Sequence, residues 1–411
     1  MEISSSLTSA STSFSNMANN EELLTKEITL SMGPQHPSTH GVLHLLLDMK
    51  GEKIVSASPD IGYLHRGTEK IAENLLYHQF VPYTDRLDYM AGMSNNLAYV
   101  MAVEKLLGIE VTERAKYIRV VAAELSRIAG HLLCVGAWGL DLGAMTVLLY
   151  AFREREMVLD LFEMICGARM THNYLRVGGV RYDLQPAFKE KCLEFVDLLP
   201  QRLKDYEQLL TENRIWLKRN KGVGVISAED AINLGLSGPI LRSSGVKWDI
   251  RKDEPYLVYD RFAFDIPTGE NGDCFDRYIV RMEEMRQAAK IIKQALSQIP
   301  DGKPCVDMPE VVLPPRKDIE TNMEALINHF KLISHGFKVP KGEAYASIES
   351  PKGELGFYIV SDGSERPFRV KIRAPSFVNL QAISPMCKDR YLADVIAVVS
   401  SLDPVFGEAD K

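Results

Sequence analysis

Close cysteine pairs are missing from this sequence. Its 411 residues include six cysteines, and none forms a C-x-x-C pair, since they lie at positions 134, 166, 192, 274, 305 and 387. Such spacing signals neither a zinc ribbon, nor an iron-sulfur cluster site, nor a disulfide framework. The cysteine usage fits a reducing compartment best.

An excess of positive charge is missing as well. The chain has 48 lysines and arginines against 55 aspartates and glutamates, which gives a net charge of -7. A general nucleic-acid-binding protein would present a basic face, so we expect no nucleic-acid partner. With 46% hydrophobic and 25% charged residues, the composition is that of a globular protein with room for one large domain or two.

The sequence also lacks a long uncharged hydrophobic run. Its most apolar region, residues 120–152, is interrupted by Glu124, Arg127, His131 and Asp141. A membrane-spanning helix needs about 20 predominantly apolar residues. We therefore expect that the chain does not cross a membrane, which leaves docking on a membrane surface open.

The first 24 residues contain neither lysine nor arginine and are rich in serine, threonine and asparagine. A secretory signal or a transit peptide needs basic residues, and a signal also needs an apolar core. We expect residues 1–24 to form a flexible tail.

The remaining chain alternates between strand-like and helix-like patterns. The expected strands cover residues 28–32, 42–49 and 53–58, with a hairpin around the turn 361–364. The segment at 62–70 is expected to lead into a helix that ends near residue 80. Further helices are expected over residues 86–107, 112–138, 144–166, 274–298, 319–334 and 389–402. A helical hairpin is expected over residues 186–221 with a break at Pro200, and a short helix is expected after residue 227. On the helix expected over 86–107, Tyr89 begins an apolar stripe at spacing four.

Three histidines lie within nine residues in the loop at residues 33–44: His36, His40 and His44. Two prolines deny this loop a helix, so it is expected to aim His36 and His40 away from the flanking strands. Histidines near a turn often only satisfy backbone groups. A zinc site is the weaker alternative, because no helix places the pair on one face and no glutamate follows it.

Charged residues also fall inside the apolar helix expected over residues 112–138. Glu124, Arg127 and His131 share one face at spacings of three and four, which is typical of a solvated or ion-paired stripe, although the stretch is otherwise too apolar to present a plain solvated face. Asp141 follows at a glycine-flanked corner between two apolar helices, where an acid needs a partner.

Five motifs in a fixed order carry a resemblance to a known family. They are GPQHPSTHG at 33–41, GYLHRGTEK at 62–70, PYTDRLDY at 82–89, GLDLG at 139–143 and IESPKGELGFY at 348–358. From about residue 27 to its end, the chain resembles the quinone-site subunit of type I NADH:quinone oxidoreductase, or respiratory complex I, often called the 49 kDa or D subunit. The resemblance implies an α+β fold with a mostly helical core, like the large subunit of nickel-iron hydrogenase.

This resemblance also implies a division of the chain. The implied parts are the tail at 1–24, an N-terminal β region at 25–62, a helical core at 63–340, a β-hairpin region at 341–378, and a C-terminal helix and tail at 379–411 that lines a quinone cavity.

The hydrogenase relationship can be tested on individual residues. In that family four thiolates hold nickel and iron, and their positions fall here on Asp88 and Ala91 and on Val405 and Glu408. No soft ligand remains, so the resemblance implies a chain without a metal of its own. The cavity left behind would take another redox partner.

In the complex I family that partner is a quinone, either ubiquinone or menaquinone. The resemblance places the two carbonyl oxygens of its headgroup near His40 and Tyr89, and gives Asp141 the role of pairing with His40 and restoring its proton. Reduction of a quinone adds two electrons and two protons, which fits a donor at each end of the ring. The alternative for Tyr89 is a tyrosine that packs in the core.

Arg66 matches the arginine that lies against a [4Fe-4S] cluster held by a neighbouring small subunit, where a cation would raise the cluster potential. Its alternative is a surface ion pair with Glu69. The resemblance further places His36, Arg86, Asp88, Val405 and Glu408 around the quinone and cluster region. Many relatives have His-Ala-Ala-Tyr where this chain has Thr-His-Asn-Tyr at 171–174, so the role of that histidine does not transfer to His172.

The resemblance implies a quinone-reducing subunit of a proton-translocating NADH:quinone oxidoreductase. Its expected partners are the small cluster-bearing subunit and the membrane subunit of the quinone channel, and its expected place is peripheral, on the cytoplasmic side of the cell inner membrane. Two alternatives are a hydrogenase-type metalloenzyme, which the missing thiolates disfavour, and a scaffold subunit without catalytic function.

Overall fold

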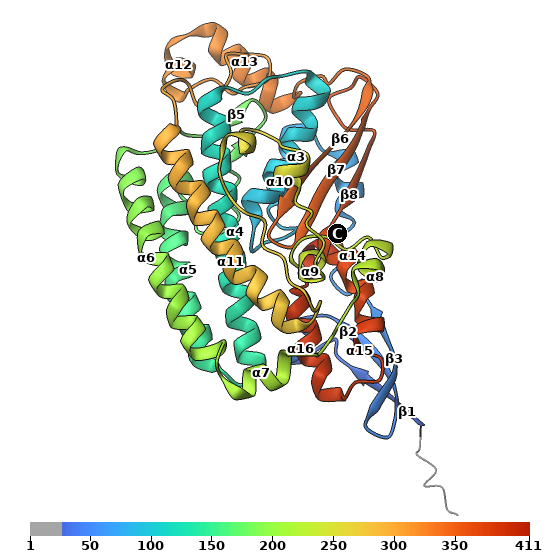
Figure 1. Ribbon diagram of the computed structural model, residues 1–411. Helices are drawn as coiled ribbons and strands as arrows, with labels where there is room; N and C mark the ends of the chain where they lie inside the picture. Colours follow the sequence, from blue (N-terminus) through green and yellow to red (C-terminus); the bar gives the residue numbers. More distant parts are fainter. Residues whose placement is uncertain (1–26) are drawn as a thin grey trace, which may run out of the picture.

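The computed structural model describes residues 27–411, and long helices form its centre. The longest is α4 (Glu113–Asp141), which packs against α5 (Met145–Cys166) and α11 (Cys274–Gln298), while α6 (Pro186–Leu210) packs against both of these neighbours. Figure 1 shows these four helices side by side. The expected helices at 112–138, 144–166 and 274–298 are confirmed. The expected tail at 1–24 lies outside the described residues.

Helix α4 is buried on most sides because it is surrounded by other elements. Among the helices within residues 27–411, it alone is long and apolar enough to span a membrane, and 89% of its apolar window is buried inside the fold. A mostly buried helix of this kind is typical of a protein core, since its apolar residues already contact other side chains.

The N-terminal strands form an antiparallel sheet in the order β1 (Glu27–Met32), β2 (His44–Lys50) and β3 (Lys53–Asp60). All three predicted strands are confirmed. The loop between β1 and β2 contains a short 3-10 helix, η1 (Pro37–Thr39), and His40 follows it with a left-handed backbone. The sheet therefore presents the histidine loop at one of its ends.

The region around residues 68–107 differs from the prediction. Helix α1 (Thr68–Asn74) ends early, α2 (Tyr77–Thr84) continues through Pro82, and α3 (Gly92–Leu107) begins six residues later than expected. In the loop between α2 and α3, the Asp88 side chain accepts a hydrogen bond from the N–H of Met90, and the Asp85 side chain accepts one from the N–H of Asn173 in a distant segment. Such side-chain bonds to the backbone compete with helix formation. Tyr89 therefore lies on a loop, not on the helix stripe.

The predicted break at Pro200 is wrong, because α6 runs without interruption from Pro186 to Leu210. Pro200 lies on the exposed face of α6, and the packing of this helix against α5 and α11 keeps it continuous although one backbone hydrogen bond is lost. The helix expected after residue 227 is confirmed as α8 (Ala228–Asn233), and Ser227 caps it. The helix expected over 319–334 is two helices, α12 (Arg316–Thr321) and α13 (Met323–Ser334).

Other short elements join these helices. They are β4 (Leu175–Arg176), β5 (Gly179–Val180), α7 (Arg214–Asn220), α9 (Pro239–Ser243), α10 (Ile250–Asp253) and η2 (Tyr259–Arg261).

The C-terminal region forms a second antiparallel sheet. The predicted hairpin is part of three strands, β6 (Gly342–Ser350), β7 (Gly353–Ser361) and β8 (Arg369–Arg373), because a further tight turn joins β6 to β7 at residues 351–352. The chain then forms α14 (Pro375–Asn379), η3 (Leu380–Ala382), α15 (Ile383–Cys387), α16 (Leu392–Leu402) and α17 (Phe406–Ala409). Residues 403–410 are all buried, and Figure 1 places the C-terminus beside α14 and the second sheet. The chain therefore ends inside the fold.

Candidate functional site

His40 lies beside Asp141, the last residue of α4. The His40 Nε2 atom is 3.3 Å from Asp141 Oδ2, and 17% and 14% of the two side chains are exposed. The Ser400 hydroxyl on α16 donates a hydrogen bond of 2.6 Å to the same carboxylate oxygen. The structure thus gives the glycine-flanked acid two partners, and His40 remains accessible to a ligand.

The other two histidines of this loop, His36 and His44, form hydrogen bonds with nearby residues. His36 is exposed, and its Nδ1 atom accepts a hydrogen bond from the Ser38 N–H in a cap of η1. His44 contacts Ser31 at 2.7 Å and Asp60 at 3.0 Å across the sheet. No group of three metal-ligating side chains occurs within residues 27–411, so the zinc alternative has no support from this part of the chain.

Tyr89 is half-buried on the loop before α3. Its pKa is raised, first by burial and then by the neighbouring negative charge of Asp88. Asp88 itself is buried, and its Oδ2 atom lies 3.2 Å from the Lys352 ammonium. A phenol with a raised pKa keeps its proton until a strongly basic group approaches it.

Lys352 joins the Tyr89 loop to the C-terminal residues. It lies in the turn between β6 and β7, only 1% of its side chain is exposed, and its Nζ atom is also 3.2 Å from Asp403 Oδ2. Sequence reasoning missed this residue, because a lysine in a turn normally indicates an exposed position. Its only signal was its place within the motif at 348–358.

Glu408 is fully buried near this lysine. Its Oε1 atom accepts hydrogen bonds from the Ser376 N–H, at 3.0 Å, and from the Ser376 hydroxyl. Burial raises its pKa to about 7, and the charge of Asp88 adds to the effect. Val405 is buried close by and is apolar. Asp88 and Glu408 are two of the positions that align with metal-binding thiolates in the hydrogenase comparison. The structure therefore brings both acids close to one lysine.

The end of α16 connects the His40 and Tyr89 halves of the site. Ser400 in its last turn binds Asp141, and Asp403 immediately after it contacts Lys352. The contacts of the His40 partner Asp141 and of the loop that carries Tyr89 thus meet at one helix end.

Arg66 and Arg86 contact each other through the backbone. The Arg66 guanidinium donates a hydrogen bond of 2.7 Å to the carbonyl of Arg86, whose own guanidinium bonds the Pro82 carbonyl at 2.6 Å. Both side chains are exposed. The alternative ion pair of Arg66 is not formed, because Glu69 pairs with Arg369 and Lys371 at 3.2 Å each.

His172 is buried and packs on Phe162, with ring centroids 4.5 Å apart. Burial lowers its pKa to about 4, so it is neutral at pH 7. Thr171 and Asn173 on either side have left-handed backbones, which turn His172 inward.

The charged face of α4 is ion-paired and buried. Glu124 contacts Arg127 at 3.1 Å and Arg251 at 3.2 Å, and His131 contacts Glu284 at 2.8 Å. The solvated alternative is therefore wrong, since Arg251 on α10 and Glu284 on α11 cover this face.

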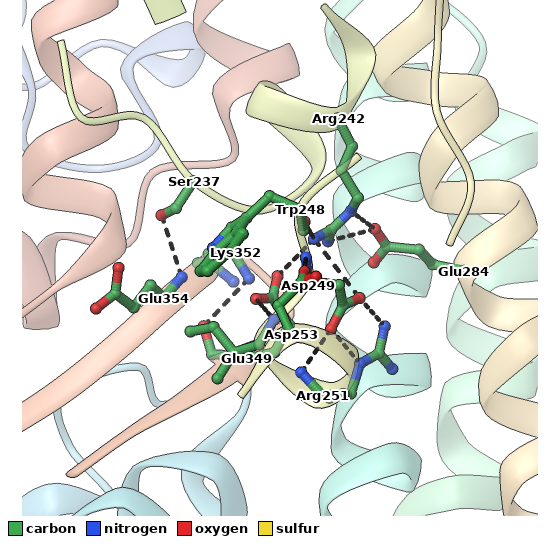
Figure 2. Close-up of polar contacts among 12 residues, drawn as sticks. Ser237, Arg242, Trp248, Asp249, Arg251, Asp253, Glu284, Glu349, Lys352 and Glu354 are labelled. Carbon is green, nitrogen blue, oxygen red and sulfur yellow. Dashed lines mark hydrogen bonds and ion pairs between the residues drawn. The ribbon is translucent and has the colours of Figure 1, made fainter. Parts of the chain in front are cut away.

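A buried ion network continues from α4 to the second sheet. Figure 2 shows Arg242 between Glu284 and Glu349, with distances of 2.6 and 2.9 Å. Asp249 pairs with Arg251 at 2.6 Å. Burial alone would raise the pKa of Asp249, but Arg251 and Arg242 lower it to about 2. The charges of this network are therefore paired.

The network also fixes the turn that carries Lys352. The Arg127 guanidinium donates hydrogen bonds to the carbonyls of Glu349 and Ser350, at 2.5 and 3.1 Å. These residues directly precede the turn, so its position depends on α4.

Comparisons with known proteins agree on one family. A family model described as "Respiratory-chain NADH dehydrogenase, 49 Kd subunit" matches residues 141–411. The chain is 60% identical over 392 residues to the D 2 subunit of NADH-quinone oxidoreductase from Rhizobium etli (strain CIAT 652), and the match covers 95% of this chain and 97% of the relative. It is 55% identical over 387 residues to the D subunit of NADH-quinone oxidoreductase from Geotalea uraniireducens, and that match covers 94% and 99% of the two chains.

Proposed function

This chain belongs to the 49 kDa subunit family of respiratory-chain NADH dehydrogenases, and from that premise we propose that it is the quinone-reducing subunit of a proton-translocating NADH:quinone oxidoreductase. The observation that supports the proposal is that His40 lies beside Asp141, and that the contacts of Asp141 and of the loop carrying Tyr89 meet at the end of α16. A quinone headgroup between His40 and Tyr89 has a proton donor for each carbonyl.

The chemistry of the two donors fits quinone reduction. A carboxylate 3.3 Å from the His40 ring orients the imidazole, and an imidazole side chain is suited to pass a proton to a reacting oxygen. Tyr89 has a raised pKa, so it gives its proton only to a reduced, strongly basic quinone oxygen. Proton delivery at the Tyr89 end therefore waits for the electrons.

The electrons come from outside the chain in this proposal. The exposed Arg66 guanidinium, fixed on the Arg86 carbonyl, would face a [4Fe-4S] cluster held by the small subunit. The quinone, ubiquinone or menaquinone, would enter through a channel shared with that small subunit and with one in the membrane. The chain would then lie peripherally on the cytoplasmic side of the inner membrane, and proton pumping would occur in other subunits.

Tyr89→Phe in the assembled complex tests the function. The change removes one hydroxyl and keeps the ring, so we expect electron transfer from NADH to a hydrophilic artificial acceptor to stay normal and quinone reduction to fall by more than tenfold. Tyr99→Phe is the matched control: it removes a structural hydrogen bond of 2.9 Å to the Tyr77 carbonyl, which costs roughly 1 kcal/mol but leaves quinone turnover intact.

His40→Ala should affect the same step, and the double variant should lose less than the sum of the two effects, because both groups hold one headgroup. Unchanged quinone turnover in the Tyr89→Phe complex, with quinones of several tail lengths, would instead support the scaffold alternative.

A further inference from the structure

The cluster of Lys352 with Asp88, Asp403 and Glu408 has no role in the function proposed so far. It joins three separate parts of the chain: the loop before α3, the turn between β6 and β7, and the buried C-terminal segment. All four side chains are buried. Burying charged groups is costly unless they are paired, so a cluster of this kind needs a reason.

The cluster directly adjoins Tyr89. Asp88 precedes Tyr89 in the chain, and Gly407 precedes Glu408 and packs against the same tyrosine. A methyl group on Gly407 would lie 3.2 Å from Tyr89 Cδ1 and only 2.3 Å from the Leu87 carbonyl oxygen. The close approach of these two backbones brings the segments that carry Asp88 and Glu408 together beside the Tyr89 ring.

The cluster holds more acids than cations. Three carboxyl groups face the single ammonium of Lys352, and the other ionisable groups around them are Cys134 on α4, whose thiol is neutral because burial raises its pKa to about 12, and Arg281 on α11. Lys411 acts on Glu408, and Arg66 acts on Tyr89. Asp88 and Asp403 each lie 3.2 Å from the Lys352 ammonium, whereas Glu408 forms no ion pair among residues 27–411. A proton on one carboxyl group removes the negative charge that this single ammonium leaves unpaired.

Glu408 is the group best suited to hold that proton. Two donors from Ser376 occupy its Oε1 atom, whereas its Oε2 atom is buried and has no hydrogen-bond partner among the described residues. An ionised carboxylate with a bare buried oxygen is unfavourable, and the pKa of Glu408, about 7, agrees with a protonated group. Asp88 and Asp403 instead lie against the ammonium.

We propose that Glu408 is a buried proton store that reprotonates Tyr89 through Asp88 after each quinone reduction, with Lys352 holding the cluster together. This inference rests on the function proposed above. As two electrons reach the quinone, the Tyr89 O–H bond breaks and its proton joins the reduced carbonyl oxygen. Asp88 then takes a proton from Glu408, whose O–H bond breaks, and passes this proton to the phenolate, and no electrons move in these two steps.

Lys352 makes the transfer possible, because its ammonium stabilises the extra negative charge left on the cluster when Glu408 ionises. The three residues that follow Glu408, namely Ala409, Asp410 and Lys411, form part of the wall of a hollow of about 470 Å³, which Glu408 itself does not line. Water in this hollow supplies the proton that converts the Glu408 carboxylate back to its protonated form. The cycle therefore consumes one proton from water for each proton that Tyr89 delivers.

Glu408→Gln in the assembled complex tests the store. The amide keeps the shape and can still accept from Ser376, but it cannot donate a proton as an acid. We expect the first quinol per complex to form at the normal rate, because Tyr89 starts with its own proton, and we expect steady-state turnover to fall at least fivefold. Turnover of the parent complex should fall as pH rises through about 7, whereas that of the variant should lose this dependence.

Two further variants separate a proton store from a structural acid. Glu408→Asp keeps an acid and should restore part of the steady-state rate together with its pH dependence, and Asp88→Asn should reproduce the Glu408→Gln defect. If Glu408→Gln fails to assemble, these two variants decide the matter by themselves. Glu343→Gln, the same chemical change on the exposed start of β6, is the matched control and should behave like the parent.

The outcomes also distinguish the two proposals. A defect of Tyr89→Phe in the first turnover, combined with parent-like rate and pH profile for Glu408→Gln, would overturn the proton store and keep the quinone site. A first-turnover defect in Glu408→Gln equal to that in later turnovers would also overturn it, because a store acts only between turnovers. Normal turnover of Tyr89→Phe would remove the quinone site itself.

Discussion

For some residues of the site the role follows from the sequence around them, and for others it does not. Asp141 stands at a corner between apolar helices, so its need for a partner follows from the sequence, and the structure supplies His40 and Ser400. Lys352 gives no such signal, since only the folded chain brings it to Asp88 and Asp403. The positions of such partners depend on contacts between distant segments, which local sequence patterns do not contain.

Asp141→Asn tests the acid beside His40. The amide keeps the size of the side chain and its bond with Ser400, but it removes the negative charge 3.3 Å from the imidazole. We expect assembly to be preserved and quinone turnover to fall about tenfold, which corresponds to about 1.4 kcal/mol of lost stabilisation.

Steady-state quinone reduction by the purified complex measures this effect. Asp260→Asn, at an exposed position of η2, is the control for the same chemical change. An Asp141→Asn complex that assembles and reduces quinone at the parent rate would make Asp141 a structural residue only.

At the scale of elements, amphipathic helices and alternating strands were predicted well, and segments held by side-chain bonds were not. Helix α11 has the expected bounds because its apolar pattern and its Asp273 cap agree. The loop before α3 was predicted as helix, because nothing in the sequence shows that Asp85 bonds the N–H of Asn173. The break at Pro200 was overestimated, since the packing of α6 against its neighbours outweighs the loss of one backbone hydrogen bond.

The ion network between α4, α9, α11 and β6 makes a prediction about stability. Arg242→Met leaves Glu284 and Glu349 without their buried cation, and breaking a buried pair in this way costs about 3 to 5 kcal/mol. Arg369→Met removes partly exposed pairs with Glu69 and Glu73 and should cost less than about 1 kcal/mol. Urea unfolding of the full chain measures both.

The pH dependence of unfolding gives a second measurement of this network. Burial opposes ionisation of Glu284, but Arg242 and His131 hold its pKa well below 4.5. The ionised form therefore stabilises the fold above about pH 4.5, its ordinary value, and this stability is lost as pH falls toward the lowered pKa. Arg242→Met should weaken that acid-side loss. Equal destabilisation by the two arginine changes would contradict a structural role for the network.

At the scale of the whole molecule, the site depends on the entire chain. His40 comes from the N-terminal loop, Asp141 from the end of α4, Lys352 from the second sheet, and Asp403 and Glu408 from the buried C-terminus. The order of the motifs in the sequence was enough to predict the family and its fold, and the comparisons confirm this prediction. The division into parts at 25–62, 63–340, 341–378 and 379–411 stays a prediction, and the contacts between these parts explain why none is expected to work alone.

Removing residues 1–24 is the prediction at this scale. Strand β1 begins at Glu27 and pairs with β2 over its whole length, so a chain that begins at residue 25 keeps the sheet that presents the His40 loop. We expect it to enter the complex and to reduce quinone at the parent rate. A chain that begins at residue 34 is the control: it loses β1 and leaves the edge of β2 unpaired, and it should assemble poorly, because His40 then lacks the strand that supports its loop. Purification of both complexes followed by quinone reduction assays measures the difference. Failure of the shorter truncation to assemble would show that the first 24 residues hold a contact that their composition does not predict.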